Sequence, residues 1–533
     1  MPQAGAAVAM VFVALSALAG GFIGSQAVST QDRLEDRYRV YTAALALVEE
    51  QFVTTREADR LVYGSIAGML RTLDPHSTFL EPRQFEQMRE RQGGRYFGIG
   101  ITIALVNGDI TVISLFEGSP AYLAGIRRGD VIVGVGEESA KGWQTEDVVV
   151  RVKGPRGTTV DIVLRRPGVA EPFRLTVARD EINIVTVRTA FMVQPGTGYV
   201  RLQDFSETTD RELGDALARL RREGMERLIL DLRDNPGGPL DQAIAVSSRF
   251  LKRGEMVVYT DGRIENMDEQ FRATATGEYT DIPLIVMVNR NSASASEIVS
   301  GALQDHDRGL VVGEATFGKA LVQSVYRVSG DAALALTTGR YFTPSGRLIQ
   351  RPWDGSFDEY LTYSLREQNA DRLHDPAELK YTDSGRKVYS GGGIEPDHFV
   401  EGPVEGFDPK RFTRLLYARG AFISFAERFT KQGDMRPGAR SAATYTVAPG
   451  WIVTDAMVDQ FGEFVRSQGA RFDEAAFDAD RDFIKAMIHF EVDNDLFGVE
   501  EARRTLSQVD PQVQSALGFF AEARQLLLTS RSK

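Results

Sequence analysis

The sequence predicts an α/β chain of mixed α+β type, in which a mostly parallel sheet with helices carries a smaller strand-rich insertion and helical segments at both ends. Two apolar runs, 228–232 and 283–288, are typical of strands buried on both faces, and each leads through small residues into a helical pattern. A glycine-rich stretch of short strands precedes them. Amphipathic helical spacing fills the residues before Gln92 and those after Gly402.

Length and composition allow several globular domains. The 533 residues can form several cores, and 43% hydrophobic with 26% charged residues is ordinary for a globular protein. A net charge of -12 argues against a nucleic-acid binder and leaves no basic patch for anionic lipid. The absence of cysteine excludes disulfides, thiol catalysis and thiolate metal sites, and no His-Glu-x-x-His helix supports a zinc peptidase. We therefore expect neither a metal nor a cofactor.

The N-terminus contains an uncharged apolar run, residues 4–23, that is long enough to span a bilayer. Ser25-Gln26-Ala27 resembles a signal-peptidase site, but no lysine or arginine precedes the run and the first basic residue is Arg33. Residues 1–28 are predicted to be a signal anchor or a signal peptide, and both readings stay open; a buried core helix is the weaker alternative. We expect an exported protein on the periplasmic side of the cell envelope, anchored to the inner membrane or released after cleavage.

A tight turn rich in small residues follows the strand 283–288 and offers three serines, Ser292, Ser294 and Ser296. A helical pattern begins near Glu297. Free backbone N–H groups at the start of a helix can hold a developing negative charge, so this turn is a good place for a nucleophile.

A serine nucleophile needs a base, and histidine is improbable here. Of only five histidines, His306 alone lies nearby, and on a helix it would be about three turns away. Lys319 is flanked by Phe317, Leu321 and Val322, an apolar setting that can desolvate the ammonium and lower its pKa. A neutral lysine can take a proton from a serine.

The strand 228–232 ends in a second turn, Asn235-Pro236-Gly237-Gly238, before a helix from about Leu240. Its backbone N–H groups can also point at an oxyanion. The spacing excludes a dinucleotide-binding loop, although a bare tight turn is an alternative. Asp305, 11 residues after Ser294, could assist the site or serve as a structural charge.

Residues 289–323 resemble the active-site region of the C-terminal processing (tail-specific) proteases, a Ser-Lys peptidase family with a PDZ domain. The family pairs the middle serine of a Ser-Ala-Ser-Ala-Ser run with a lysine 25 positions later and a glutamine four further. This selects Ser294, Lys319 and Gln323, with the glutamine orienting the lysine. The resemblance also implies an oxyanion hole made by Ala295 with either Gly237 or Gly238. One departure is Ala320, where the family usually has glycine; alanine would be strained there if the position needs a positive φ.

The stretch Phe97-Gly98-Ile99-Gly100-Ile101 and the glycine-containing turns after it resemble a PDZ domain. This implies a loop whose N–H groups converge on the carboxylate of a peptide, which then adds as a strand to a sheet edge. A generic small β domain is the alternative.

The sequence therefore predicts a serine endopeptidase that recognises protein C-terminal tails; a catalytically silent PDZ scaffold or adaptor is the alternative. Expected partners are protein or peptide substrates with free C-termini, a regulatory or adaptor protein, the membrane through the N-terminal segment and a second copy of the chain, but no nucleic acid. The predicted divisions are 1–28 (signal), 29–92 (helical), 93–180 (PDZ), 181–402 (protease core) and 403–533 (helical).

Overall fold

The computed structural model describes residues 35–106, 108–116, 118–166, 168–264, 267–353, 360, 362, 374–402, 410–430, 447–469 and 471–531. The predicted signal segment, 1–28, lies outside these residues. Every helix within the described ranges is too short or too polar to cross a bilayer.

The chain packs as two compact units. One contains the residues up to Glu81 together with Val325–Ala335, and the other contains Pro82–Ser324 and Leu336 onward. In the first unit, α2 (Ala58–Leu70) precedes the short strand β1 (Thr78–Leu80). The strand pairs antiparallel with the start of β18, with Thr78 opposite Ala335. The N-terminal region is thus helical with one strand, and a distant hairpin segment of the predicted core completes it.

The second unit is organised around a six-stranded sheet in the order β10-β11-β12-β15-β16-β21. All of its neighbouring pairs are parallel except β10 with β11, which confirms the mostly parallel sheet. The strands are β10 (Thr189–Gln194), β11 (Thr197–Arg201), β12 (Arg227–Asp231), β15 (Leu284–Val288), β16 (Leu310–Gly313) and β21 (His398–Phe399).

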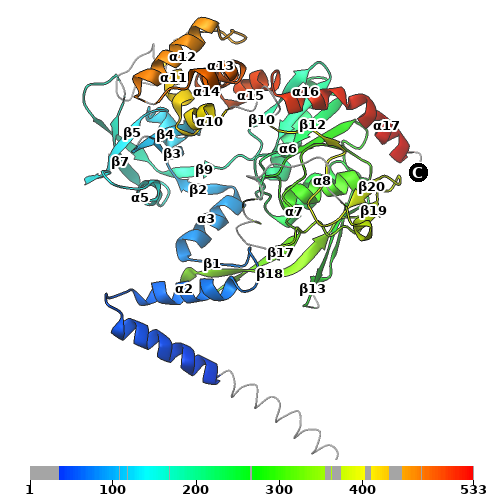
Figure 1. Ribbon diagram of the computed structural model, residues 1–533, viewed down its shortest axis with the longest axis horizontal. Coiled ribbons are helices and arrows are strands. Elements are labelled where there is room, and N and C mark those ends of the chain that lie inside the picture. The colour runs from blue at the N-terminus through cyan, green and yellow to red at the C-terminus, as the bar shows by residue number, and fades with distance from the viewer. Residues whose placement is uncertain are drawn as a thin grey trace, which may run out of the picture. The chain divides into compact units, whose positions relative to one another are not determined.

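Helices cover both faces of this sheet because its strands are apolar on both faces. Leu230 and Val286 face a core shared with α6 (Thr209–Arg222), α7 (Leu240–Ser248) and α8 (Ala295–Asp305). The residues next to them, Ile229 and Ile285, face the opposite core, which contains α16 (Pro511–Gly518) and α17 (Phe520–Arg531). Figure 1 shows α16 and α17, in red, beside the green strands. The last part of the predicted C-terminal helical region therefore packs against the central sheet.

The parallel arrangement positions two turns at one edge. β12 and β15 are neighbours, with Asp231 opposite Met287, so the chain leaves both strands at the same end of the sheet. Carboxyl ends of parallel strands are where open α/β sheets build their sites. The turn of Gly237 and Gly238 and the turn of Ser294 consequently lie side by side.

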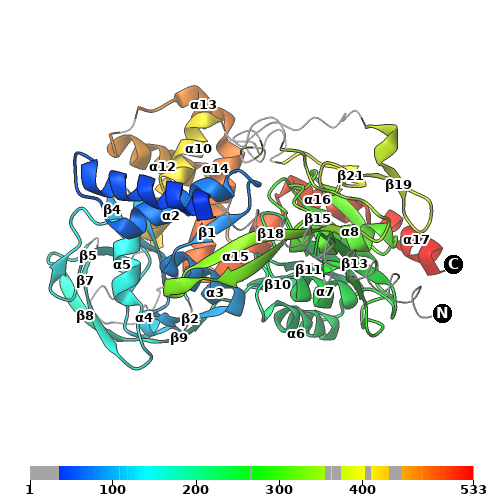
Figure 2. The ribbon, with the colours of Figure 1, turned by 90° about the horizontal axis from the view of Figure 1, so that it is seen from below.

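The strand-rich insertion forms its own antiparallel sheet and core. The strands lie in the order β3 (Ile101–Val106), β4 (Asp109–Leu115), β5 (Val131–Val135), β7 (Thr159–Arg165) and β8 (Phe173–Ala178), with β6 (Glu138–Ser139) beside β5 and the helices α4 (Pro120–Leu123) and α5 (Thr145–Val152). Figure 2 shows α5, β5 and β7 of this domain in cyan. The strands β2 (Arg95–Gly98) and β9 (Asp180–Asn183) pair with each other where the chain enters and leaves the insertion.

The chain after β21 forms a separate group of helices, whose core is rich in aromatic side chains. Its helices are α10 (Arg411–Ala418), α11 (Ala421–Thr430), α12 (Asp455–Ser467), α13 (Glu474–Ala479), α14 (Arg481–Leu496) and α15 (Val499–Ser507). The remaining elements are α3 (Pro82–Gly93), β13 (Met256–Gly262), β14 (Gln270–Arg272), β17 (Leu321–Arg327), η2 (Ser329–Asp331), β18 (Ala333–Phe342), η4 (Pro376–Glu378), β19 (Leu379–Tyr381) and β20 (Lys387–Tyr389).

Candidate active site

Ser294 is the N-cap residue of α8, at the end of the turn that follows β15. Its φ of 55° lies in the left-handed region, which a residue with a side chain adopts at a cost. The serines on either side have structural bonds: Ser292 Oγ donates to the carbonyl of Leu232 at 2.8 Å, and Ser296 Oγ donates to the carbonyl of Asn235 at 3.0 Å. Both outer serines are buried, whereas Ser294 is half-buried. Of the three, Ser294 is therefore the one placed for chemistry.

The carboxylate of Glu297 joins the serine turn to the lysine turn. One of its oxygens accepts from the backbone N–H of Ser294 at 2.8 Å and from that of Lys319 at 2.9 Å. The other accepts from the hydroxyl of Thr316 at 2.5 Å and from the N–H of Gly318 at 2.7 Å. Burial raises the pKa of Glu297, against the four hydrogen bonds, which favour the ionised form. The four donors make this buried carboxylate a fixed junction.

Tyr341 makes a second junction from β18. Its hydroxyl lies 2.5 Å from the carbonyl oxygen of Lys319 and 3.2 Å from that of Ser294. The N–H groups of Ser294 and Lys319 thus share Glu297, and their C=O groups share Tyr341. The two residues are held near each other through their backbones.

The side chain of Lys319 points to its predicted partner. Lys319 Nζ donates to Gln323 Oε1 at 3.0 Å, and both residues are half-buried. Ala320, next in the chain, is fully buried, and its N–H donates to Gln350 Oε1 at 2.8 Å. Its φ is not among the positive values found in the described non-glycine residues, so alanine is unstrained where the family usually has glycine.

Gly237 is pressed against the serine turn. A Cβ at this position would lie 2.7 Å from the nitrogen of Ala295 and 2.8 Å from Ser294 Cβ, and the φ of 94° also favours glycine. Its N–H donates to Asn235 Oδ1 at 2.9 Å. In the part of the chain that the structure describes, the N–H groups of Gly238 and Ala295 have no acceptor. Each of the two turns therefore has one N–H group available as a donor: that of Ala295, next to Ser294, and that of Gly238, next to Gly237.

Asp305 is not brought to this group. It lies at the other end of α8, 11 residues from Ser294, which is about 16 Å along a helix. Both of its oxygens have structural partners, the guanidinium of Arg347 and the N–H of Ser345. The structure gives Asp305 a buried ion pair.

The predicted peptide loop lies at the edge of the small β domain. Gly100 has a φ of 81°, and a Cβ there would come within 2.3 Å of Ser119 Cβ. Ile99 is 1% exposed and its side chain belongs to the core of this domain, whereas Phe97 is 43% exposed. Ile99 can therefore contact a peptide only through its backbone. The next strand, β3, ends the row of paired strands and has no other neighbour among the described strands. Its free edge can accept an added strand.

Sequence reasoning missed Glu297, Thr316 and Tyr341. A glutamate three residues after an N-cap serine is the capping-box pattern, and this pattern could have singled out Glu297. Thr316 and Tyr341 have no such pattern in the sequence, and only their contacts in the fold reveal them.

Both the sheet that carries the two turns and the small β domain match families of known proteins. The family model described as peptidase family S41 matches residues 196–355, and a PDZ-domain model matches residues 112–166. The carboxy-terminal-processing protease of Bartonella bacilliformis is 39% identical over 308 residues, covering 57% of this chain and 70% of that protein. The carboxy-terminal processing protease CtpA of Bacillus subtilis is 32% identical over 414 residues, covering 77% and 84%. A solved photosystem II D1 C-terminal processing protease is 32% identical, covering 57% of this chain and 82% of that one, with a TM-score of 0.34.

An α/β core with a PDZ domain, together with these relatives, defines a serine peptidase. The chain belongs to peptidase family S41, among the carboxy-terminal processing proteases.

Proposed function

We propose that this chain cleaves protein substrates at Ser294, with Lys319 as the base, after its PDZ domain has captured their C-terminal tails. The observation that carries the proposal is the shared anchoring of Ser294 and Lys319 on one oxygen of Glu297. A catalytically silent scaffold would have no need for the set of Ser294, Lys319 and Gln323.

In the first step, neutral Lys319 Nζ takes the proton of Ser294 Oγ while Oγ bonds to the carbonyl carbon of the scissile peptide. The carbonyl oxygen becomes an oxyanion. It is held by the N–H groups of Ala295 and Gly238, which have no other acceptor among the described residues. Gly237 keeps the space beside Ser294 free of a side chain.

Collapse of this intermediate breaks the carbon–nitrogen bond, and Lys319 passes its proton to the leaving amine. An ester on Ser294 remains. Lys319 then takes a proton from water as the water attacks this ester, and Ser294 recovers its proton when the acid product leaves. Gln323 keeps the lysine side chain in place by its 3.0 Å hydrogen bond.

The PDZ domain would add the substrate tail to the free edge of β3. The loop from Phe97 to Ile101 would receive the terminal carboxylate through backbone N–H groups. If this is correct, amidation of a substrate's C-terminus weakens cleavage. Equal cleavage of the acid and the amide would rule out tail capture.

The decisive experiment compares wild type with Ser294→Ala on an unfolded protein that ends in apolar residues. Ser292→Ala is the matched control, since Ser292 sits in the same turn but its hydroxyl bonds only to structural groups. Loss of cutting in Ser294→Ala alone supports the assignment. No cutting by wild type would favour the scaffold function.

We also propose that residues 1–28 direct the chain to the cell envelope, on the strength of the apolar run 4–23. Cell fractionation with N-terminal sequencing of the mature protein tests this. An intact N-terminus in the cytosolic fraction would contradict it.

A further inference from the structure

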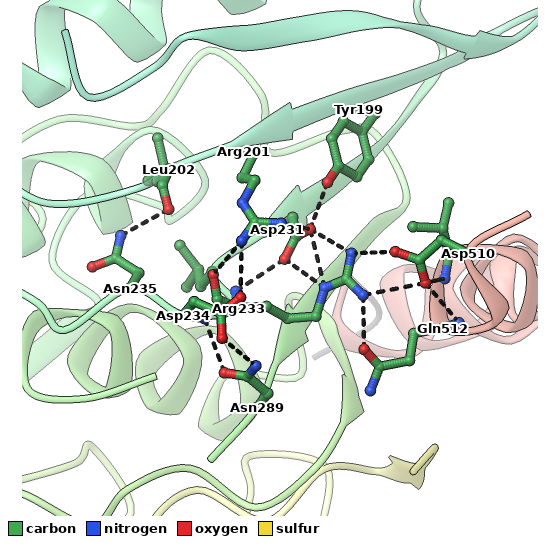
Figure 3. Close-up of polar contacts among 12 residues, drawn as sticks. Tyr199, Arg201, Leu202, Asp231, Arg233, Asp234, Asn235, Asn289, Asp510 and Gln512 are labelled. Carbon is green, nitrogen blue, oxygen red and sulfur yellow. Dashed lines mark hydrogen bonds and ion pairs between the residues drawn. The ribbon is translucent and has the colours of Figure 1, made fainter. Parts of the chain in front are cut away.

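A buried cluster of charges, shown in Figure 3, includes residues that lead directly into the glycine turn, which runs from Asn235 to Gly238. At its centre is Asp231, the fully buried last residue of β12. Arg233 donates to both oxygens of this carboxylate at distances from 2.8 to 3.1 Å, and Tyr199 donates its hydroxyl at 2.5 Å. Arg201 lies 3.6 Å from the same carboxylate. Two buried guanidinium groups therefore share one carboxylate.

The C-terminal part of the chain supplies a second carboxylate to Arg233. Arg233 donates to Asp510 through both terminal nitrogens, at 2.9 and 3.3 Å, and one of these nitrogens also donates to Gln512 Oε1 at 2.7 Å. Asp510 caps the N-terminus of α16, where it accepts from the N–H groups of Gln512 and Val513. Because Val513 packs in the apolar core under the sheet, the cap is fixed against the strands.

Arg233 also leads into the glycine turn. Arg201 donates to the carbonyl of Arg233 at 3.2 Å and to Asp234 Oδ2 at 3.0 Å. Asp234 has a φ of 60°, a left-handed conformation that surrounding bonds must maintain in a residue with a side chain. Its N–H donates to Asn289 Oδ1, in the serine turn, at 2.9 Å. The arginines therefore hold the backbone that leads to Gly237 and Gly238.

We infer that Asp510 is a positioning residue for catalysis: by pairing with Arg233 it fixes the glycine turn against Ser294, so that helix α16 is part of the catalytic unit. This inference rests on the proposed role of the glycine turn at the oxyanion. Without the Asp510 charge, Arg233 and Arg201 would share only the Asp231 and Asp234 carboxylates. Arg503 of α15 adds a further positive charge nearby: burial and Arg201 lower its pKa, and Tyr199 and Asp231 only partly offset them.

The test variant is Asp510→Asn, because asparagine keeps the shape of aspartate and an amide oxygen for the N–H groups of Gln512 and Val513, but removes the charge and the second oxygen that accepts from Arg233. Removing an oxyanion donor outright costs on the order of 100-fold or more in kcat, so a displaced turn that keeps its donors should cost about tenfold. KM should change less than about twofold, because ground-state binding does not use the oxyanion contacts. A peptide aldehyde, whose adduct with the serine places an oxygen at this position, should bind about tenfold more weakly.

Asp473→Asn is the matched control, since Asp473 caps α13 with a 3.1 Å bond to the N–H of Ala476 and pairs with no arginine in the described residues. It should keep wild-type kcat and aldehyde affinity. If Asp510→Asn does not fold, Gln512→Ala takes its place, with an expected loss of about threefold in both quantities.

A purely structural ion pair would lower the unfolding temperature of Asp510→Asn and leave kcat and aldehyde affinity at the wild-type level, and that result would overturn the inference. Failure of the proposed function is different, because wild type itself would then neither cleave nor bind the aldehyde.

Discussion

The backbone N–H groups of Ser294 and Lys319 donate to the same carboxylate oxygen of Glu297, at 2.8 and 2.9 Å. The two residues are 25 positions apart in the sequence. The strands before their turns, β15 and β16, are paired, and the N–H of Phe317 donates to the carbonyl of Ser292 at 2.9 Å. Within this frame, a buried side chain ties the backbones of the proposed nucleophile and base to each other. Tyr341 repeats this arrangement on their carbonyl groups.

Glu297→Gln should damage both activity and stability. In wild type, four donors bind the two carboxylate oxygens of Glu297. Glutamine has only one side-chain oxygen, so some of these buried donors would lose their acceptor, at a cost of about 1–3 kcal/mol of folding free energy for each. We expect kcat/KM to fall at least about tenfold, since a small displacement of catalytic groups is costly. Peptide cleavage and urea unfolding measure the two effects. Asp147→Asn, in the exposed capping box of α5, is the control and should leave cleavage unchanged.

Lys319→Arg should abolish turnover while the protein stays folded. Arginine keeps the positive charge but does not lose its proton in proteins, so it cannot accept one from Ser294. In wild type the rate should rise with pH, because only the neutral lysine is the base. The measurement is the pH profile of kcat/KM for both proteins. Substantial cleavage by Lys319→Arg would remove the lysine from the mechanism.

Gly237→Ala should abolish cleavage, because its Cβ would come within 2.8 Å of Ser294 Cβ and 2.6 Å of the carbonyl of Ala293. The matched control is Gly224→Ala. Gly224 has a φ of 92°, close to the 94° of Gly237, but a Cβ there would meet nothing within 4 Å. Both variants should lose about 1 kcal/mol of stability from the positive φ, whereas only Gly237→Ala should lose activity. Equal cleavage rates in the two variants would contradict the close approach.

Ala320→Gly, the change toward the usual family residue, should give no gain in activity. Ala320 is fully buried with an unstrained φ, so glycine would only remove a buried methyl group and increase the freedom of the unfolded chain. We expect kcat/KM within about twofold of wild type and a stability loss of about 1 kcal/mol. Thermal unfolding and peptide cleavage check both values. A large rise in kcat would mean that alanine restrains the site.

The sequence predicts the central strands well: the apolar runs 228–232 and 283–288 correspond to β12 and β15, because such runs are typical of strands buried on both faces. The spacing of Ser294, Lys319 and Gln323 likewise predicts that their side chains lie together, and Lys319 and Gln323 do form a hydrogen bond. Helical geometry alone could have excluded Asp305 from the group, because 11 residues of helix separate it from Ser294.

The packing of distant segments could not be predicted. The amphipathic pattern of α16 shows that one face is apolar, but it does not show which surface that face covers. The contact of Asp510 with Arg233 spans 277 residues and follows only from the docking of α16 under the sheet. Residues 325–335 give no sign in the sequence that they pack with the N-terminal region.

Acid should weaken the protein through Asp231. Burial alone would raise the pKa of Asp231, but Arg233 and Arg201 outweigh it and hold the pKa well below its ordinary value. Because the folded pKa is the lower one, the ionised carboxylate stabilises the fold above the unfolded pKa of about 3.9, and this contribution is lost as the pH falls below about 4. Urea unfolding of wild type between pH 7 and pH 3 should therefore show a steep loss at the acid end.

Asp231→Asn separates this contribution from those of other carboxylates. It should cost about 3–5 kcal/mol at pH 7, because Arg233 and Arg201 would lose a buried partner. Its stability should then fall less than that of wild type between pH 5 and pH 3, since the group that titrates is gone. Parallel curves for the two proteins would show that Asp231 keeps the same pKa in the folded and unfolded states, and the charge cluster that leads into the glycine turn would not stabilise the ionised carboxylate.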